Sequence, residues 1–202
     1  MIKLQERLPD SVTVRGRKYK LKPDFRNVLM MMETMDNPEI IPEARTYQAL
    51  RHVIRHVPKD DTLCAEIMAE VRKTLFPEAK KKESGKKLTS FVQDADLIRG
   101  AFRQVYGIDL FRDPVHWVEF SCLLSCLPEG SRYSDIIGIR ARPLPEPTKW
   151  NRKEREALMR AKAECKLEVS EKEAEQNLQD NISGIAHFLL SIAKGSEVKH
   201  GS

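Results

Sequence analysis

Apolar residues recur at helical spacing over most of this chain, and this periodicity constrains its fold more than any other feature. Such a stripe is the face that an amphipathic helix buries. A proline or a glycine stops each stripe, because proline lacks the amide hydrogen that a helix interior needs and glycine favours the left-handed conformation in which helices end. The sequence therefore predicts a mainly α fold. The predicted helices span 23–36, 42–57, 60–76, 94–107, 114–127 and 132–141.

Aspartates precede four of these segments, as expected of N-cap residues whose carboxylates accept hydrogen bonds from first-turn amides. The expected caps are Asp24, Asp60 or Asp61, Asp94 or Asp96, and Asp113, which precedes Pro114. In the segment 94–107, Leu97, Ile98, Ala101, Phe102 and Val105 form the predicted buried stripe. The candidate core residues of the protein are Leu97, Phe102, Trp117, Phe120 and Leu124.

Residues 11–21 follow a different period from the rest of the chain, because apolar and polar residues alternate. Period-two alternation with Gly16 in a three-residue turn predicts a β-hairpin. A lone hairpin is marginally stable in water, so it must pack on another element. The full prediction is an N-terminal β-hairpin packed on a small helical bundle, followed by a charged helical C-terminal extension.

Composition divides the chain into a predicted domain over 1–142 and an extension over 143–202. The domain includes a Lys-rich flexible loop at 78–92, and the extension begins with the stiff connector PLPEPTK. Near the C-terminus, a 4-3-4-3 apolar stripe predicts a helix that either docks on the core or binds another chain. This stripe consists of Leu178, Ile182, Ile185, Leu189 and Ile192.

The formal net charge of +5 is a mild basic bias, and part of it is concentrated in one run of lysines. A run of this kind is usually solvated, and its alternative role is a patch for nucleic acid or an acidic partner. Aromatic residues make up only 6% of the chain, too few for a broad surface on which bases stack. The candidate basic patch is Lys80, Lys81, Lys82, Lys86 and Lys87.

The segment FRDPVHWVEFSCLLSC at 111–126 raises the question of a metal or thiol site. His116 and Cys122 are too far apart on a helix to share a metal, whereas Cys122 and Cys126 share a face. We interpret these cysteines as small apolar fillers beside Trp117 and Phe120. A site that combined them with His52 and His56 is disfavoured by the arginines beside those histidines.

The sequence lacks the nucleotide-binding and nucleophile-elbow motifs, and its carboxylates lie beside Lys and Arg as on solvated helix faces. We therefore expect no enzymatic activity, no catalytic residue, no cofactor and no metal. The first residues carry charges throughout, and the apolar runs are too short for a bilayer, so we expect no signal peptide and no membrane partner. A cytoplasmic protein with reduced thiols follows from this interpretation.

Methionines gather in the first predicted helix. Methionine either fills gaps in a core or forms an adaptable surface for apolar helices of varied sequence. Met31, Met32 and Met35 are therefore candidate partner-binding residues, together with the C-terminal stripe.

Two stretches of the chain resemble the bacteriophage gene-product-fifteen family. The first is ERLPDSVTVRGRKYKLKPDFRNVL, and the second joins DADLIRGAFRQVYGIDL to HWVEFSCLLSCLPEGSRYSDIIGIRARPL. The resemblance implies a siphophage or prophage tail assembly chaperone, encoded near the tape-measure gene, in the host bacterial cytoplasm. Its implied partner is the tape-measure protein, with other tail proteins or self-association as further partners. A basic nucleic-acid-binding regulator of a phage or prophage is the alternative.

Overall fold

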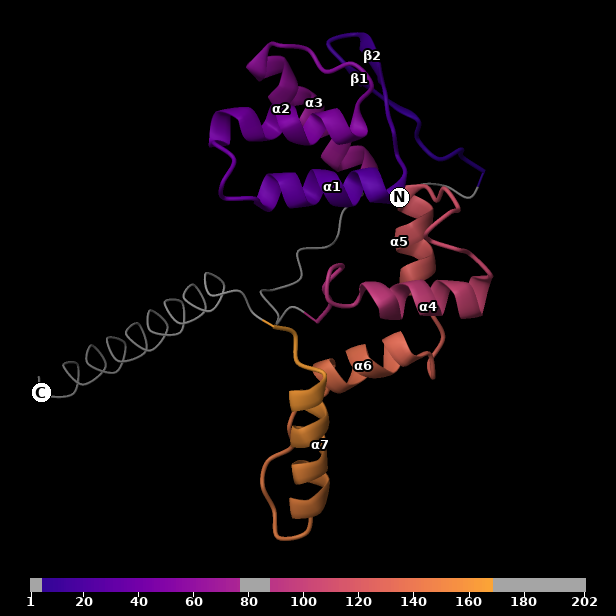
Figure 1. The fold of residues 1–202 in the computed structure, drawn as a ribbon, viewed down its shortest axis with the longest axis vertical. Helices are drawn as coiled ribbons and strands as arrows, with labels where there is room; N and C mark the ends of the chain where they lie inside the picture. Colours follow the sequence, from indigo (N-terminus) through magenta and orange to yellow (C-terminus); the bar gives the residue numbers. More distant parts are fainter. Residues whose placement is uncertain (1–4, 77–87, 169–202) are drawn as a thin grey trace, which may run out of the picture. The chain divides into compact units, whose positions relative to one another are not determined.

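The computed structural model describes residues 5–76 and 88–168 (Figure 1). The chain divides into two compact units, Met1–Ala141 and Arg142–Ser202. Two of the predicted partner surfaces lie outside the described residues: the candidate basic patch within 80–87, and the apolar stripe from Leu178 to Ile192. Both stay predictions.

The predicted N-terminal hairpin consists of β1, Ser11–Val14, and β2, Arg17–Lys20, which pair antiparallel. The turn has two residues rather than the predicted three: Arg15 has φ 49° and Gly16 has φ 73°. Two-residue hairpin turns of this kind need positive φ at both central positions, which matches the right-handed twist of the strands. Arg15, the non-glycine residue at this turn, also forms an ion pair of 2.6 Å with Glu66.

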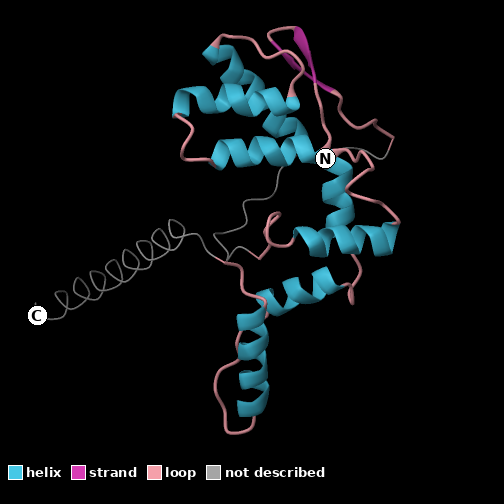
Figure 2. Cartoon of the chain, viewed as in Figure 1, coloured by secondary structure: helices cyan, strands magenta, loops and turns pink. Residues whose placement is uncertain are grey.

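The remaining elements of the described chain are helices (Figure 2), so the predicted mainly α fold is confirmed. Aspartate caps begin two of them as predicted: Asp24 accepts from the Arg26 amide and Asp60 from the Leu63 amide. The helices are α1 Phe25–Asp36, α2 Pro42–Val53, α3 Asp61–Leu75, α4 Ala95–Tyr106, α5 Trp117–Ser125, α6 Arg132–Ala141 and α7 Arg152–Glu164.

The first unit has one hydrophobic core. α1 packs on α2, α2 on α3, and α3 on β1, while α4 packs on α5 and α6 (Figure 1). Stacked aromatic rings join these elements, since the Phe120 ring lies 4.6 Å from Phe25 and 5.1 Å from Phe102. Of the candidate core residues, Phe102, Trp117 and Phe120 are buried, whereas Leu97 and Leu124 are half-buried beside the core.

Backbone pairing between 23–25 and 115–117 connects the beginning of α1 to the beginning of α5. The Phe25 amide donates to the Val115 carbonyl over 2.9 Å, and the Trp117 amide donates to the Pro23 carbonyl over 2.7 Å. This pairing leaves the chain extended up to His116, so α5 starts at Trp117, later than the predicted 114. His116 is its N-cap, and Nδ1 accepts from the Val118 amide. The predicted cap Asp113 instead accepts from the Asp109 amide in the preceding turn.

The second helix is shorter than the prediction of 42–57. Ile54 adopts an extended conformation and forms a β-bridge with Leu21, because burying Ile54 beside the hairpin requires the chain to leave the helix at Val53. Two other predictions about buried faces are wrong. Val105 of α4 is 37% exposed, and Cys122 and Cys126 lie on an exposed face of α5 rather than filling the core.

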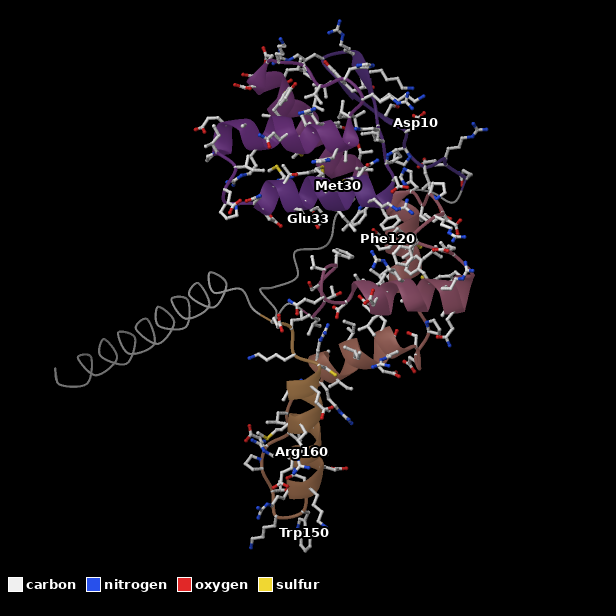
Figure 3. The ribbon with its side chains drawn as sticks, viewed as in Figure 1. Asp10, Met30, Glu33, Phe120, Trp150 and Arg160 are labelled. Atoms are coloured by element: carbon white, nitrogen blue, oxygen red, sulfur yellow. The ribbon has the colours of Figure 1, made fainter. Side chains whose placement is uncertain are left out.

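The second unit is described up to Glu168, and none of the residues of α7 is buried. The proline-rich connector runs back beside α7, and the Arg155 guanidinium donates to the Pro145 carbonyl. Figure 3 shows Trp150 just before this helix, where the Trp150 side chain is 95% exposed. Among the described residues, no helix combines the length and the apolar character that a membrane span requires.

Candidate partner-binding surface

The candidate methionines lie in a groove formed by the C-terminal ends of α1 and α3. The groove has a volume of about 420 Å³. Met31 is 2% exposed and forms its floor, while Met32 and Met35 are half-buried and leave part of their side chains accessible. We name this surface the methionine groove. Its lining residues are Met31, Met32, Met35, Asp36, Arg72, Lys73 and Phe76.

Three charged side chains border the methionine groove. Arg72 and Lys73 are exposed near the end of α3, and Asp36 is exposed at the end of α1. Lys73 lies 3.6 Å from Glu70, but the Lys73 side chain remains 78% exposed, so solvent weakens that ion pair. The groove thus offers a flexible apolar floor with cations at its edge, which suits an apolar helix flanked by acidic residues.

A second hollow of about 290 Å³ lies between α1 and α4. Figure 3 shows Met30 and Glu33 on α1, and both residues line this hollow. Phe111 also lines it and is 70% exposed, with the Arg99 guanidinium 4.3 Å from the ring centroid. The methionines of α1 therefore serve two surfaces, because Met30 faces the second hollow while Met32 and Met35 face the groove.

Sequence reasoning missed Phe111, Arg99 and the two groove cations. A signal for Phe111 existed in the sequence, because Phe111 closely follows Asp109, a residue type common in turns. In the structure the Phe111 amide donates to the Asp109 carboxylate, and a large apolar side chain in such a turn has little to pack on. No local pattern marks Arg72 and Lys73, because only the packing of α3 near α1 brings them to the methionines.

The residues considered for a metal site do not come together. Within 5–76 and 88–168, no three His, Cys, Asp or Glu side chains gather closely enough to hold a metal ion. His52 bonds instead to the Thr34 hydroxyl over 3.1 Å, and burial together with nearby Lys22 and Arg51 lowers the pKa of His52. Partial loss of solvent around the sulfur and the neighbouring Cys126 raise the pKa of the otherwise exposed Cys122 thiol, which disfavours the thiolate.

A protein-family model described as Bacteriophage Gp15 protein matches residues 4–167 of the chain. The matched region contains both stretches whose resemblance the sequence suggested, and it spans every described helix and strand. Neither the curated proteins nor the solved structures include a match to this chain. Because the family model covers well over half of the 202 residues, the chain belongs to the Bacteriophage Gp15 protein family.

Proposed function

We propose that this phage protein is a non-enzymatic tail assembly chaperone that binds the tape-measure protein and keeps it soluble during assembly of the tail tube. Family membership supports a role in a phage, and the methionine groove supports the binding of a helical partner. The proposed place of action is the cytoplasm of the host bacterium.

The methionine groove is the observation on which the proposal rests. A chaperone for a long helical protein must accept many different apolar side chains at one surface. Methionine suits this task because its unbranched, polarisable side chain adapts to different shapes. Met32 and Met35 are half-buried within a groove that is already open, so a partner helix can contact them without unfolding the core.

Co-expression with the tape-measure protein tests the proposal. Glutamine has nearly the same helix propensity and length as methionine, so Met32→Gln with Met35→Gln removes apolar surface while preserving α1. We expect this variant to leave more tape-measure protein insoluble and to co-purify less of it. Met159→Gln is the matched control, since Met159 is 51% exposed on α7, outside the groove.

Two results would contradict the proposal. If the wild-type chain neither co-purifies with the tape-measure protein nor raises its soluble fraction, the chaperone function is wrong. If the wild type does both and the groove variant equals it, the function survives but the groove is not the binding surface.

A further inference from the structure

We propose that the solvent face of the N-terminal sheet is a binding site for an acidic helix of a partner polypeptide. The site consists of five cations, which we name the sheet-face basic patch: Lys18, Lys20, Lys22, Arg51 and Arg55. This inference does not rest on the proposed function, because it uses neither the methionine groove nor the tape-measure protein.

The residues that follow α2 extend the hairpin by one short segment. Leu21 and Ile54 form an antiparallel bridge, with the Lys22 amide donating to the Val53 carbonyl over 2.8 Å and the Arg55 amide donating to the Lys20 carbonyl over 3.2 Å. Leu21 and Ile54 are 3% and 1% exposed, so both point into the core.

This register places Lys20 directly opposite Arg55. Side chains alternate between the two faces of a strand, so the neighbours of two buried residues lie together on the solvent face, with Cβ atoms about 5 Å apart. Like charges in directly opposite positions destabilise a sheet. Lys18 lies two residues from Lys20 along β2 and is exposed like Lys20 and Arg55, so it adds a third cation to the same face.

Two further cations border this face. The Lys22 ammonium donates to the carbonyl of Arg51, which lies in the last turn of α2. Burial and then the charges of Arg51 and Arg55 lower the pKa of Lys22, so the three cations lie close enough to repel one another. A carboxylate close to Lys22, Arg51 and Arg55 would reduce this repulsion.

Asp10 and Glu33 are acidic groups of the described residues that lie near this region. The Ser11 hydroxyl bonds to the Asp10 carboxylate over 2.8 Å, and this bond lowers the Asp10 pKa more than the charges of Lys18 and Lys20 do. The charge of Glu33 acts on His52 instead, where it opposes the lowering of the His52 pKa. Within 5–76 and 88–168, the charges of Lys18 and Lys20 act on Asp10, whose carboxylate is already bonded to Ser11. The five cations of the patch outnumber this carboxylate, and the imbalance provides the charge complementarity for an acidic partner.

The geometry favours a polypeptide over nucleic acid. The aromatic residue of β2, Tyr19, is 8% exposed, so the patch has no ring on it for stacking bases. Carboxylates at positions i and i+4 of a helix have Cβ atoms about 5–6 Å apart, which matches the opposed pair Lys20 and Arg55. An acidic helix face can therefore place one carboxylate against each of these two cations.

Fluorescence anisotropy with the purified full chain tests this proposal. The probe is a labelled alanine-based helical peptide with glutamate pairs four residues apart, and the comparison probe carries glutamine at the same positions. We expect binding of the glutamate peptide that weakens with salt, and much weaker binding of the glutamine peptide. Lys20→Glu with Arg55→Glu should weaken binding by about tenfold, as the loss of two exposed ion pairs implies.

The matched control is Lys153→Glu with Arg160→Glu, which changes the net charge equally at two exposed positions of α7. Figure 3 labels Arg160 on this helix. We expect this control to bind almost as the wild type does. Equal weakening by both double variants would overturn the proposal, because net charge alone would then explain it. Absence of binding by the wild type would overturn it as well. The proposal would also be overturned if an oligonucleotide bound more tightly than the peptide and if Lys20→Glu with Arg55→Glu abolished that binding.

A stability measurement separates a binding role from a structural one. Lys20→Glu places a carboxylate opposite Arg55, so this single variant should raise the melting temperature while it weakens peptide binding. If Lys20→Glu lowers the melting temperature instead, the neutral variant Lys20→Gln with Arg55→Gln distinguishes a binding role from a structural one. Peptide binding by that variant at the wild-type level would overturn the proposal, and weakened binding would support it.

Discussion

Asp94 is the clearest case of a residue whose role depends on contacts far away in the sequence. It is 1% exposed and accepts two hydrogen bonds from the Arg140 guanidinium, over 2.8 and 2.9 Å. The Ser90 amide adds a third, also over 2.9 Å. As the residue before α4, Asp94 occupies the predicted cap position, but its side chain makes no cap hydrogen bond. Its carboxylate instead attaches α6 to the beginning of α4.

Replacing Asp94 with Asn should lower the free energy of unfolding by about 3 kcal/mol, because a nearly buried guanidinium would lose its counter-charge. Urea denaturation of the purified chain measures this change. The control is Asp96→Asn on the same helix, where the side chain is 97% exposed and the change should stay within about 0.5 kcal/mol. Equal effects from both substitutions would contradict a specific role for the Asp94–Arg140 pair.

The same pair predicts how stability changes with pH. Burial by itself would raise the pKa of the Asp94 carboxyl, but the hydrogen bonds from Arg140 and Ser90 outweigh it and hold the pKa below its ordinary value of 3.8. The unfolded chain then binds a proton at this carboxyl more readily than the folded chain does. The stabilisation that ionised Asp94 gives to the folded state is therefore fully present above pH 3.8, and it is lost as the pH falls through the folded-state pKa. Urea titrations of wild type and Asp94→Asn should therefore converge on acidification. A constant difference down to the acid transition would contradict this.

The thiols differ in accessibility, and alkylation of the native protein should report it. Cys122 and Cys126 are exposed, whereas Cys64 is 1% exposed and burial raises the pKa of its thiol. The pKa of the Cys122 thiol is raised as well, so accessibility to iodoacetamide sets the order, and we expect modification of Cys122 and Cys126 well before Cys64. Peptide mass spectrometry after a short reaction measures this order. Early modification of Cys64 in the folded chain would show that α3 is not packed as described.

At the scale of one element, α4 has one glycine within it and one at its C-cap, and we expect opposite effects from substituting them. Gly107 ends the helix with φ 70°, a conformation that strains any residue with a Cβ, whereas Gly100 lies within the helix. A Cβ at either position meets open space. We expect Gly107→Ala to lower the free energy of unfolding by about 1 kcal/mol and Gly100→Ala to raise it by a similar amount. Thermal unfolding of both variants measures the two signs, and shifts of the same sign would contradict the assignment.

For the whole molecule, the distribution of buried residues predicts where stability resides. Within the described chain, every buried apolar side chain lies at or before Tyr133, and α7 buries none. A chain that ends at Ala141 should therefore unfold cooperatively at nearly the melting temperature of the full chain. Calorimetry of both proteins measures this. A large fall on truncation would favour the alternative that the apolar stripe from Leu178 to Ile192 completes the core.

Local sequence determined the kinds of element and most of their ends. Periodicity predicted α1, α3 and α4, and the predicted caps Asp24 and Asp60 are confirmed. Gly107 ends α4 in the left-handed conformation, as a glycine after an apolar stripe should. Capping and chain termination depend on residues a few positions apart, so local sequence determines them. The five buried residues of α3 lie on one face, since helical spacing alone puts them there.

Tertiary structure decided what depends on residues far apart in the chain. Ile54 lies outside α2 because it pairs with Leu21 as a strand. His116 caps α5 in place of Asp113 because 115–117 pairs with 23–25. The Asp94 carboxylate binds Arg140 instead of the amides of its own helix. The candidate surfaces follow the same rule. Three methionines were visible in the sequence, but only packing set Arg72 and Lys73 beside them and Lys20 opposite Arg55, because nothing in local sequence specifies which side chains meet across elements.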